Sequence, residues 1–176
     1  MTTPTYLQCT AAVLDGFGIK PGSLQPAPPA VSRLGNWTLN RVPIGNRMAF
    51  LFMSDRTYIN FPILEGKNAV QLQDMPAFLQ HGVQQLLTAI GATPEQISAA
   101  LQDLEEVAIT RATSRSSQAM HAAITSDYAH MLRGLGGLGT HNLSEAIARV
   151  NDLPRRKLEW ASSLEATLEL LAASAA

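Results

Sequence analysis

A continuous apolar run at 48–53, Met-Ala-Phe-Leu-Phe-Met, is the feature that most constrains this chain. Consecutive side chains of a strand point to opposite faces of the sheet, so a run without polar residues must be buried on both faces. Gly45-Asn46 before the run suits a two-residue hairpin loop, and Ser54-Asp55-Arg56 after it suits a tight turn. The run therefore predicts a central strand.

Further strands are predicted on both sides of this run. Residues 37–42 and 57–63 complete a meander, and Pro62, which has no N–H to donate, favours an edge position for the last strand. A fourth strand is predicted at 106–112, and 6–9 could form a short one. These segments predict a small antiparallel sheet of three to four strands.

About five helices are predicted from apolar periodicity and from residues that start helices. The predicted N-caps, some with a proline or a capping-box partner after them, are Thr10, Asp74, Thr93, Ser114 or Ser116, Asn142 and Ser163. Strands and helices that are segregated along the chain predict a single α+β domain over residues 1–176. A Pro-rich loop at 21–35 could be disordered or could wrap the surface as an extended arm.

Composition excludes several classes of protein. The chain has 176 residues, 15% of them charged, and a net charge of −1, which argues against a disordered chain and against a strongly basic nucleic-acid binder. Cys9 is the single cysteine, so no internal disulfide can form, and we expect it to be a buried small hydrophobe. No secretory signal and no apolar run of about 20 residues is present, so we expect a cytoplasmic protein without a membrane partner.

The near-neutral charge hides a segregation along the sequence. Residues 1–60, 61–106, 107–157 and 158–176 carry net charges of +3, −5, +4 and −3. In the simpler interpretation, acidic helices and basic strands neutralise one another across the fold. In the other, arginines next to aromatic side chains bind an acidic partner; the residues that would do so are Arg41, Arg56, Arg111, Arg115 and Trp37.

The segment 113–117, Thr-Ser-Arg-Ser-Ser, is the most unusual local pattern, and we call it the serine box. It lies between a predicted strand and a predicted helix, where backbone N–H groups and the hydroxyls of Ser114 and Ser116 could hold a phosphate or a carboxylate. In the simpler interpretation, one serine caps the helix and the arginines are solvated. The glycine spacing of a P-loop is absent.

The histidines do not predict a metal site. No two of His81, His121, His130 and His141 are four residues apart on a helix, and we predict no metal and no cofactor. His121 and His130 are expected on opposite faces of one helix, each at the surface or partly buried. Asp127 could pair with Arg115 or Arg133.

The order of several short motifs resembles a known family. The motifs are Leu7-Gln8-Cys9-Thr10, Gly18-Ile19-Lys20-Pro21, Asn36-Trp37, Asn40-Arg41, Phe50-Leu51-Phe52, Asp55-Arg56-Thr57, Thr113-Ser114-Arg115-Ser116, Asp127-Tyr128 and Asn151 with Pro154. Together they resemble a family of small bacterial proteins, met in chromosomes and mobile elements, that carry a domain of unknown function. The resemblance implies one full-length domain and no assigned reaction.

These observations favour a non-enzymatic binding or regulatory module, because no catalytic constellation is present and the charges are segregated. Its partner would be an acidic protein or a nucleic acid, with a protein favoured, and an inhibitor of a host defence system, of anti-CRISPR type, is one concrete version. An enzyme acting on a small phosphorylated or carboxylated substrate through the serine box is an alternative, with Asp127 or a histidine as base. A homo-oligomeric scaffold is the third, because the run at 48–53 is wholly apolar.

Overall fold

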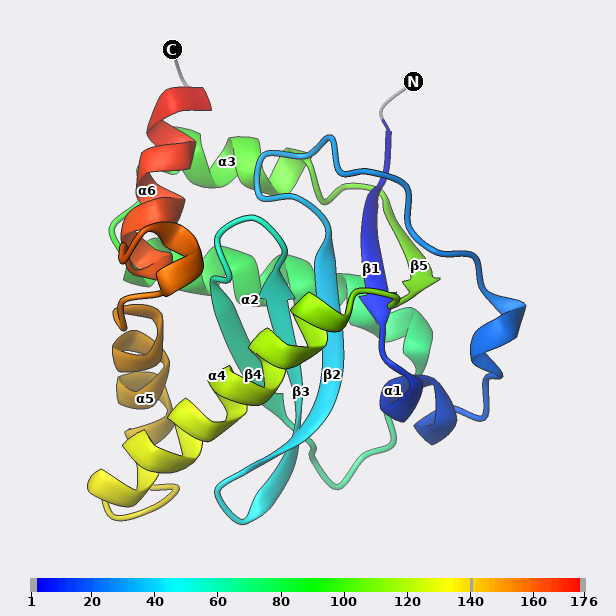
Figure 1. Ribbon diagram of the computed structural model, residues 1–176, viewed down its shortest axis with the longest axis horizontal. Helices are drawn as coiled ribbons and strands as arrows, with labels where there is room; N and C mark the ends of the chain where they lie inside the picture. Colours follow the sequence, from blue (N-terminus) through cyan, green and yellow to red (C-terminus); the bar gives the residue numbers. More distant parts are fainter. Residues whose placement is uncertain (1–2, 140, 175–176) are drawn as a thin grey trace.

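A mixed five-stranded sheet forms the centre of the protein (Figure 1). The computed structural model describes residues 3–139 and 141–174. In chain order the strands are β1 (Thr5–Cys9), β2 (Trp37–Ile44), β3 (Arg47–Ser54), β4 (Asn60–Leu64) and β5 (Val107–Arg111), and in the sheet they follow the order β4-β3-β2-β1-β5. The three strands of the meander pair antiparallel, whereas β1 is parallel to both of its neighbours.

Helices cover both faces of this sheet, which confirms the predicted α+β class (Figure 1). Their bounds are α1 (Ala11–Gly16), α2 (Met75–Ala89), α3 (Pro94–Gln102), α4 (Arg115–Gly134), α5 (Asn142–Asn151) and α6 (Ser163–Ser174). Helix α2 lies behind the sheet in Figure 1, and α4 crosses its front diagonally with α5 beside it. The sheet therefore contributes to one core on each side.

The expected three- to four-stranded antiparallel sheet was wrong in one respect, because β1 joins the meander to β5. Leu7 of β1 is paired with Trp37 of β2 on one side and with Ile109 of β5 on the other. A five-residue segment with weak alternation does not reveal its partners, since a parallel pairing depends on a long crossover rather than on a local turn. The fifth strand and the parallel pairs thus come from tertiary structure.

Strand β3 confirms the prediction of a central strand that is buried on both faces. Its residues from Ala49 to Ser54 are all buried, and it lies between β2 and β4. Phe50 and Phe52 belong to the core on the α2 side, and Leu51 and Met53 belong to the core on the α4 side. The apolar run is therefore covered within a single chain.

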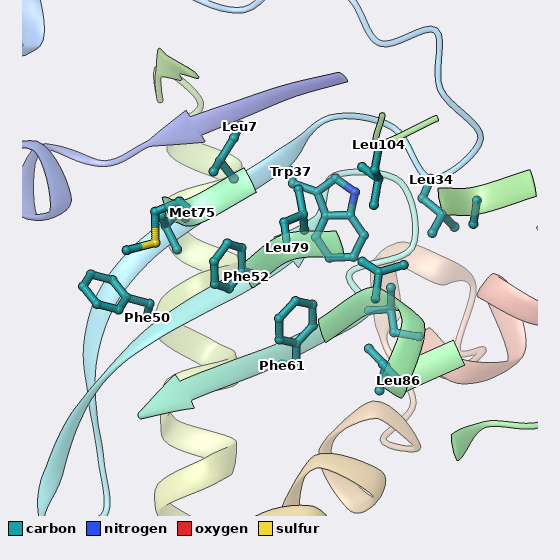
Figure 2. Close-up of a cluster of buried hydrophobic side chains, with 14 of the residues drawn as sticks. Leu7, Leu34, Trp37, Phe50, Phe52, Phe61, Met75, Leu79, Leu86 and Leu104 are labelled. Carbon is teal, nitrogen blue, oxygen red and sulfur yellow. The ribbon is translucent and has the colours of Figure 1, made fainter. Parts of the chain in front are cut away.

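The larger core lies between the sheet and α2, and aromatic rings form its centre (Figure 2). Phe61 stacks on Phe52 with ring centroids 5.1 Å apart and lies 6.1 Å from the ring of Trp37. Figure 2 shows Trp37 near Leu34, Leu79 and Leu104, and its side chain is 1% exposed. Trp37 is therefore a core residue of the folded chain.

The second core contains a buried polar network that connects β4 with α4 and α5. The hydroxyl of Tyr128 donates to Asn60 Oδ1 at 2.8 Å, and Asn151 Nδ2 donates to the Asn60 carbonyl oxygen at 2.8 Å. Asn60 N and Nδ2 in turn donate to Asn151 Oδ1. Because each of these buried groups has a partner, the network fixes how the two helices sit on the edge of the sheet.

The hairpin and the edge strand follow the sequence prediction. Ile44 pairs with Arg47, which leaves Gly45-Asn46 as the two-residue loop, and Gly45 has a φ of 60°. Strand β4, which carries Pro62, is an edge strand as expected. It begins at Asn60 rather than at 57, because the turn after β3 extends through Ile59, whose carbonyl oxygen accepts from Ser54 N.

Some predicted helix starts are confirmed and others are shifted. Thr93 and Gln96 form the predicted capping box of α3. The cap of α6 is one residue earlier than expected: Ser162 Oγ accepts from Glu165 N, and Glu165 Oε2 accepts from Ser162 N. Asn142 lies inside α5, where its side-chain amide donates to Leu135 and Gly137 carbonyl oxygens and thereby closes the preceding loop. Thr10 precedes α1, but its hydroxyl donates to Asn40 instead of capping the helix.

The Pro-rich segment 21–35 is an extended arm on the surface, which was one of the two alternatives. It runs outside β5 (Figure 1). Pro26 forms a parallel bridge with Arg111, and Gln25 O accepts from Arg111 N at 3.1 Å. The arm thus covers the end of an edge strand that would otherwise leave its backbone groups open to another chain.

None of the helices in the described ranges is long and apolar enough to span a bilayer.

We predict that Gly82→Ala destabilises the protein by about 2 kcal/mol, because overpacking a dense core costs roughly that much. A Cβ on Gly82 of α2 would overlap the ring of Phe61, which is held in the aromatic stack. Urea unfolding followed by circular dichroism measures the change in the free energy of unfolding. Gly134→Ala is the matched control, because a Cβ there meets nothing within 4 Å and the helix should gain a little stability.

Candidate functional site

The serine box begins α4, and its hydroxyls are used within the chain. Ser114 is the N-cap, and its Oγ accepts from Ser117 N at 3.1 Å. Ser116 Oγ accepts from Lys157 Nζ, while Arg115 is exposed in the first turn. The predicted capping interpretation is therefore confirmed for Ser114, and the contact with Lys157 links the box to a segment that is distant in sequence.

Arg111, at the end of β5, connects the box to the arm. Its Nε donates to the Leu24 carbonyl oxygen at 3.0 Å, in addition to the backbone bond with Gln25. Its guanidinium is thus partly engaged in holding the arm on the sheet edge. Arg111, Ser114, Arg115 and Ser116 are the predicted site residues that lie together.

Arg41 and Arg56 lie apart from the box. Arg41 is in β2, on the face of the sheet covered by α2, and it pairs with Glu65 through Nε at 2.5 Å and Nη2 at 2.9 Å. Arg56 is in the turn after β3, where its Nη1 donates to the Arg33 carbonyl oxygen at 2.9 Å. The structure therefore distributes the predicted basic residues over both faces, and with Trp37 in the core they do not form one surface.

The loop 155–161 is the neighbour that the fold brings to the box. Its first residue, Arg155, is buried and pairs with Asp127 of α4 at 2.6 Å, so Asp127 does not pair with Arg115 or Arg133 as expected. Lys157 then reaches Ser116 near the start of α4. The loop thus contacts α4 near its start, at Ser116, and past its middle, at Asp127.

Trp160, in this loop, is the site residue that the sequence analysis missed. Its side chain is 67% exposed, and among the described residues only Val31, at 66%, is a similarly exposed large apolar side chain. Its backbone is left-handed, with a φ of 70°, and that of Glu159 is too, with a φ of 53°. A tryptophan three residues after the basic run 155–157 was the available signal in the sequence, but its exposure depends on the tertiary fold.

We call the exposed group at this position the Trp160 surface. It comprises Arg115, Ser116, Arg156, Lys157 and Trp160. Three of these residues are cations, and Glu159 is an exposed anion in the same loop. The surface therefore combines an exposed aromatic ring with a local excess of positive charge.

A polar cluster lies behind the box, between the sheet and the first turns of α4. Asp55 Oδ1 accepts from Thr38 Oγ1 at 2.9 Å, and Asp55 Oδ2 accepts from Gln8 Nε2. Burial raises the pKa of the Asp55 carboxyl, and hydrogen bonds from Thr38, Gln8 and Ser117 oppose that rise. The pKa of Tyr58 is raised by burial and by the charge of Asp55. Through Ser117, the cluster anchors the start of α4 to β1, to β2 and to the turn after β3.

His121 follows one turn after Ser117 and is fully buried, not partly exposed as expected. In the described part of the chain neither ring nitrogen has a hydrogen-bond partner. Burial lowers the pKa of His121 to about 4, and the neighbouring backbone of Thr38 opposes the shift. His130, nine residues on, is exposed, so the prediction of opposite faces is confirmed.

Cys9 confirms its predicted place in the core. The thiol is buried, and burial raises its pKa to about 12. A thiol with so high a pKa is a poor nucleophile at neutral pH.

In the described ranges, no group of three or more histidine, cysteine, aspartate or glutamate side chains is arranged to hold a metal ion.

The fold and this site define an α+β protein whose mixed sheet lies between helices and whose basic, aromatic surface adjoins the start of α4. The chain belongs to the family of the domain of unknown function DUF6933, whose model matches residues 6–166. This confirms the resemblance and its near full-length extent. No curated protein matches the chain.

We predict that His121→Leu removes a loss of stability in weak acid. The unfolded chain takes up a proton on His121 near pH 6.5, whereas the folded chain does so only near pH 4, so stability falls as the pH falls between these values. The wild type should lose about 3 kcal/mol through this residue between about pH 7 and about pH 4. The raised pKa of Asp55 acts in the opposite direction and is common to both proteins.

Urea unfolding at both pH values measures this difference. At neutral pH the leucine variant should be as stable as the wild type or more so, because it removes two ring nitrogens without partners. His130→Leu, on the exposed face of the same helix, is the control and should keep the wild-type pH dependence. An unchanged pH dependence in His121→Leu would contradict the assignment.

Proposed function

We propose that this protein is a non-enzymatic binding module that engages an acidic protein through the Trp160 surface. The observation that carries the proposal is the 67% exposure of Trp160 in a loop that also carries the exposed cations Arg156 and Lys157. Tryptophan and arginine are the residues most enriched at the energetic centres of protein interfaces. A large exposed indole costs hydration free energy in the isolated chain, and a partner that buries it would recover that cost.

The backbone of the loop supports this interpretation. Left-handed conformations cost a residue with a side chain about 1 kcal/mol, and strain of this kind gathers at functional sites. Backbone hydrogen bonds nevertheless hold the loop in place: Arg155 N donates to Ala161 O at 2.9 Å, and Trp160 N donates to Arg155 O at 3.0 Å. The indole is thus presented from a fixed loop, which lowers the entropy lost when a partner binds.

The charges favour a protein over nucleic acid as partner. Arg115, Arg156 and Lys157 give three exposed cations, while Glu159 stands beside them and the whole chain carries a net charge of −1. Binding to a nucleic-acid backbone commonly uses roughly 6–10 phosphate contacts, more cations than this surface offers. A small acidic patch on a protein, with a pocket for the indole, matches the surface better.

The other predicted functions have less support from the geometry. Ser114 caps α4 and Ser116 binds Lys157, so the hydroxyls expected to bind a substrate already have partners. The apolar strand that suggested a homo-oligomeric scaffold is covered within the chain. Inhibition of a host defence system, of anti-CRISPR type, is one form that the proposed binding could take and stays a prediction.

We expect Trp160→Ala to abolish capture of the partner. Tagged wild-type protein is incubated with lysate of its native cell, with and without nuclease, and bound proteins are identified by mass spectrometry. A partner of the proposed kind is retained after nuclease treatment, is lost with Trp160→Ala and is weakened by the double variant Arg115→Ala with Lys157→Ala.

Val31→Ala is the matched control, because Val31 is similarly exposed but lies on the arm. It should retain the same partner as the wild type. Capture that disappears with nuclease would indicate nucleic acid instead. Capture that survives Trp160→Ala would show that this surface is not the binding site.

A second prediction separates binding from folding at the same residue. Trp160→Gly should raise the free energy of unfolding by up to about 1 kcal/mol relative to the wild type, because glycine adopts a positive φ without steric cost. It should lose the partner as completely as Trp160→Ala does. Thermal unfolding of the three proteins measures the order of stability, and a glycine variant less stable than the alanine variant would contradict the strain argument.

A further inference from the structure

A cavity opens on the opposite face of the sheet. It lies at the end where α1 and the segment after β4 come together, and Figure 1 shows the course of these two segments. It is a cavity of about 560 Å³, within the size range of small-molecule sites. Its walls come from α1, β2, β3, the end of β4, α2 and the segment 65–70. It is independent of the Trp160 surface, which lies against α4.

The floor of this cavity is apolar and aromatic. Phe17, just after α1, stacks on Phe50 of β3 with ring centroids 6.0 Å apart and an interplanar angle of 14°. Val13 is fully buried beneath, and Phe78 of α2 and Ile63 are only partly buried. Partly exposed rings at the base of a hollow are available to an apolar ligand, because their burial in the folded chain is incomplete.

The rim is basic. Arg41 and Lys67 line the cavity, and Arg47 adjoins it by donating to the Glu65 carbonyl oxygen. Glu65 is the acidic residue of the lining, and Arg41 lowers the pKa of its carboxyl through their ion pair. That pair uses Nε and Nη2 of Arg41 and leaves Nη1 as a donor, and Lys67 is exposed. The rim therefore has a positive excess that an anionic group would balance.

We propose that this cavity binds a small amphipathic anion, with its apolar body on Phe17, Phe50 and Phe78 and its carboxylate at Arg41 and Lys67. The apolar floor selects the body of the ligand, and the basic rim selects the sign of its head group. Bidentate or charge-assisted hydrogen bonds to a carboxylate are stronger than those to a neutral head group of the same shape.

Octanoate, octanol and octylammonium test this proposal, since they share one apolar chain and differ in head group. Each is titrated into the full chain, and binding is followed by calorimetry and by amide chemical shifts. Octanoate should bind at one saturable site that shifts Phe17, Lys67 and Phe78. Octanol should bind more weakly than octanoate because its head group is neutral. Octylammonium should bind at least about tenfold more weakly than octanoate, a difference of about 1.4 kcal/mol.

Two substitutions should block the cavity without disturbing the fold. Gly66→Trp adds a ring at a lining position where a Cβ would meet nothing within 4 Å. Ala69→Trp adds a ring at another lining position, which is exposed. Gly22→Trp is the control, because Gly22 is equally open and does not line the cavity. Circular dichroism checks that each variant folds.

Lys67→Ala should weaken octanoate binding by about three- to tenfold, whereas Lys20→Ala, at an exposed lysine away from the lining, should leave it unchanged. Octanoate binding that both blocking variants reduce and Gly22→Trp leaves intact supports the site. Three results would overturn it: no saturable binding of octanoate, binding that survives both blocking variants, or octylammonium binding as tightly as octanoate. None of these results depends on the partner proposed for the Trp160 surface.

Discussion

The burial of β3 on both faces is the constraint on which the rest of this structure depends. Six consecutive residues, Ala49 to Ser54, are buried, and the apolar side chains among them alternate between two cores. A sheet with such a strand at its centre needs a helix layer on each side. Helix α2 provides one layer and α4 with α5 the other, so the placement of the later two-thirds of the chain follows from this strand.

The two cores differ in polarity, and this difference produces the site. On the α2 side, the sheet meets its helices through stacked aromatic rings. On the α4 side, the first turns of the helix meet Asp55, Thr38 and Gln8 instead of an apolar surface. In the described ranges, the non-glycine residues with left-handed backbone are Tyr58, Glu159 and Trp160, all in the two loops that adjoin these turns. Burial of polar groups and backbone strain thus gather at one end of α4.

Ion pairs explain much of the charge segregation along the sequence. Arg33 and Arg41, from the basic first segment, pair with Asp103 and Glu65 of the acidic second segment. Mutual neutralisation across the fold therefore accounts for these arginines, as the simpler interpretation expected. Among the cations that stay exposed, one group lies in the loop of Trp160 and another at the rim of the cavity above Phe17, which is why we infer two sites and not one basic face.

Local signals in the sequence determined the elements of this protein but not their partners. The apolar run at 48–53, the loop Gly45-Asn46, Pro62 at an edge and the capping box at Thr93 each depend on interactions within a few residues, and the structure confirms them. Capping residues were harder to assign, since Asn142 and Thr10 have hydrogen-bond partners outside their own helices.

Only the tertiary structure decided where distant residues meet. Strand β1 pairs in parallel with two strands that are distant in sequence, and Trp37 and His121 are buried by elements far along the chain. Asp127 pairs with Arg155, whereas the sequence had suggested Arg115 or Arg133. Exposure of Trp160 is of the same kind, because an identical residue type is fully buried at Trp37. Periodicity and capping act over one or two turns of chain, whereas burial and charge pairing depend on how whole elements pack.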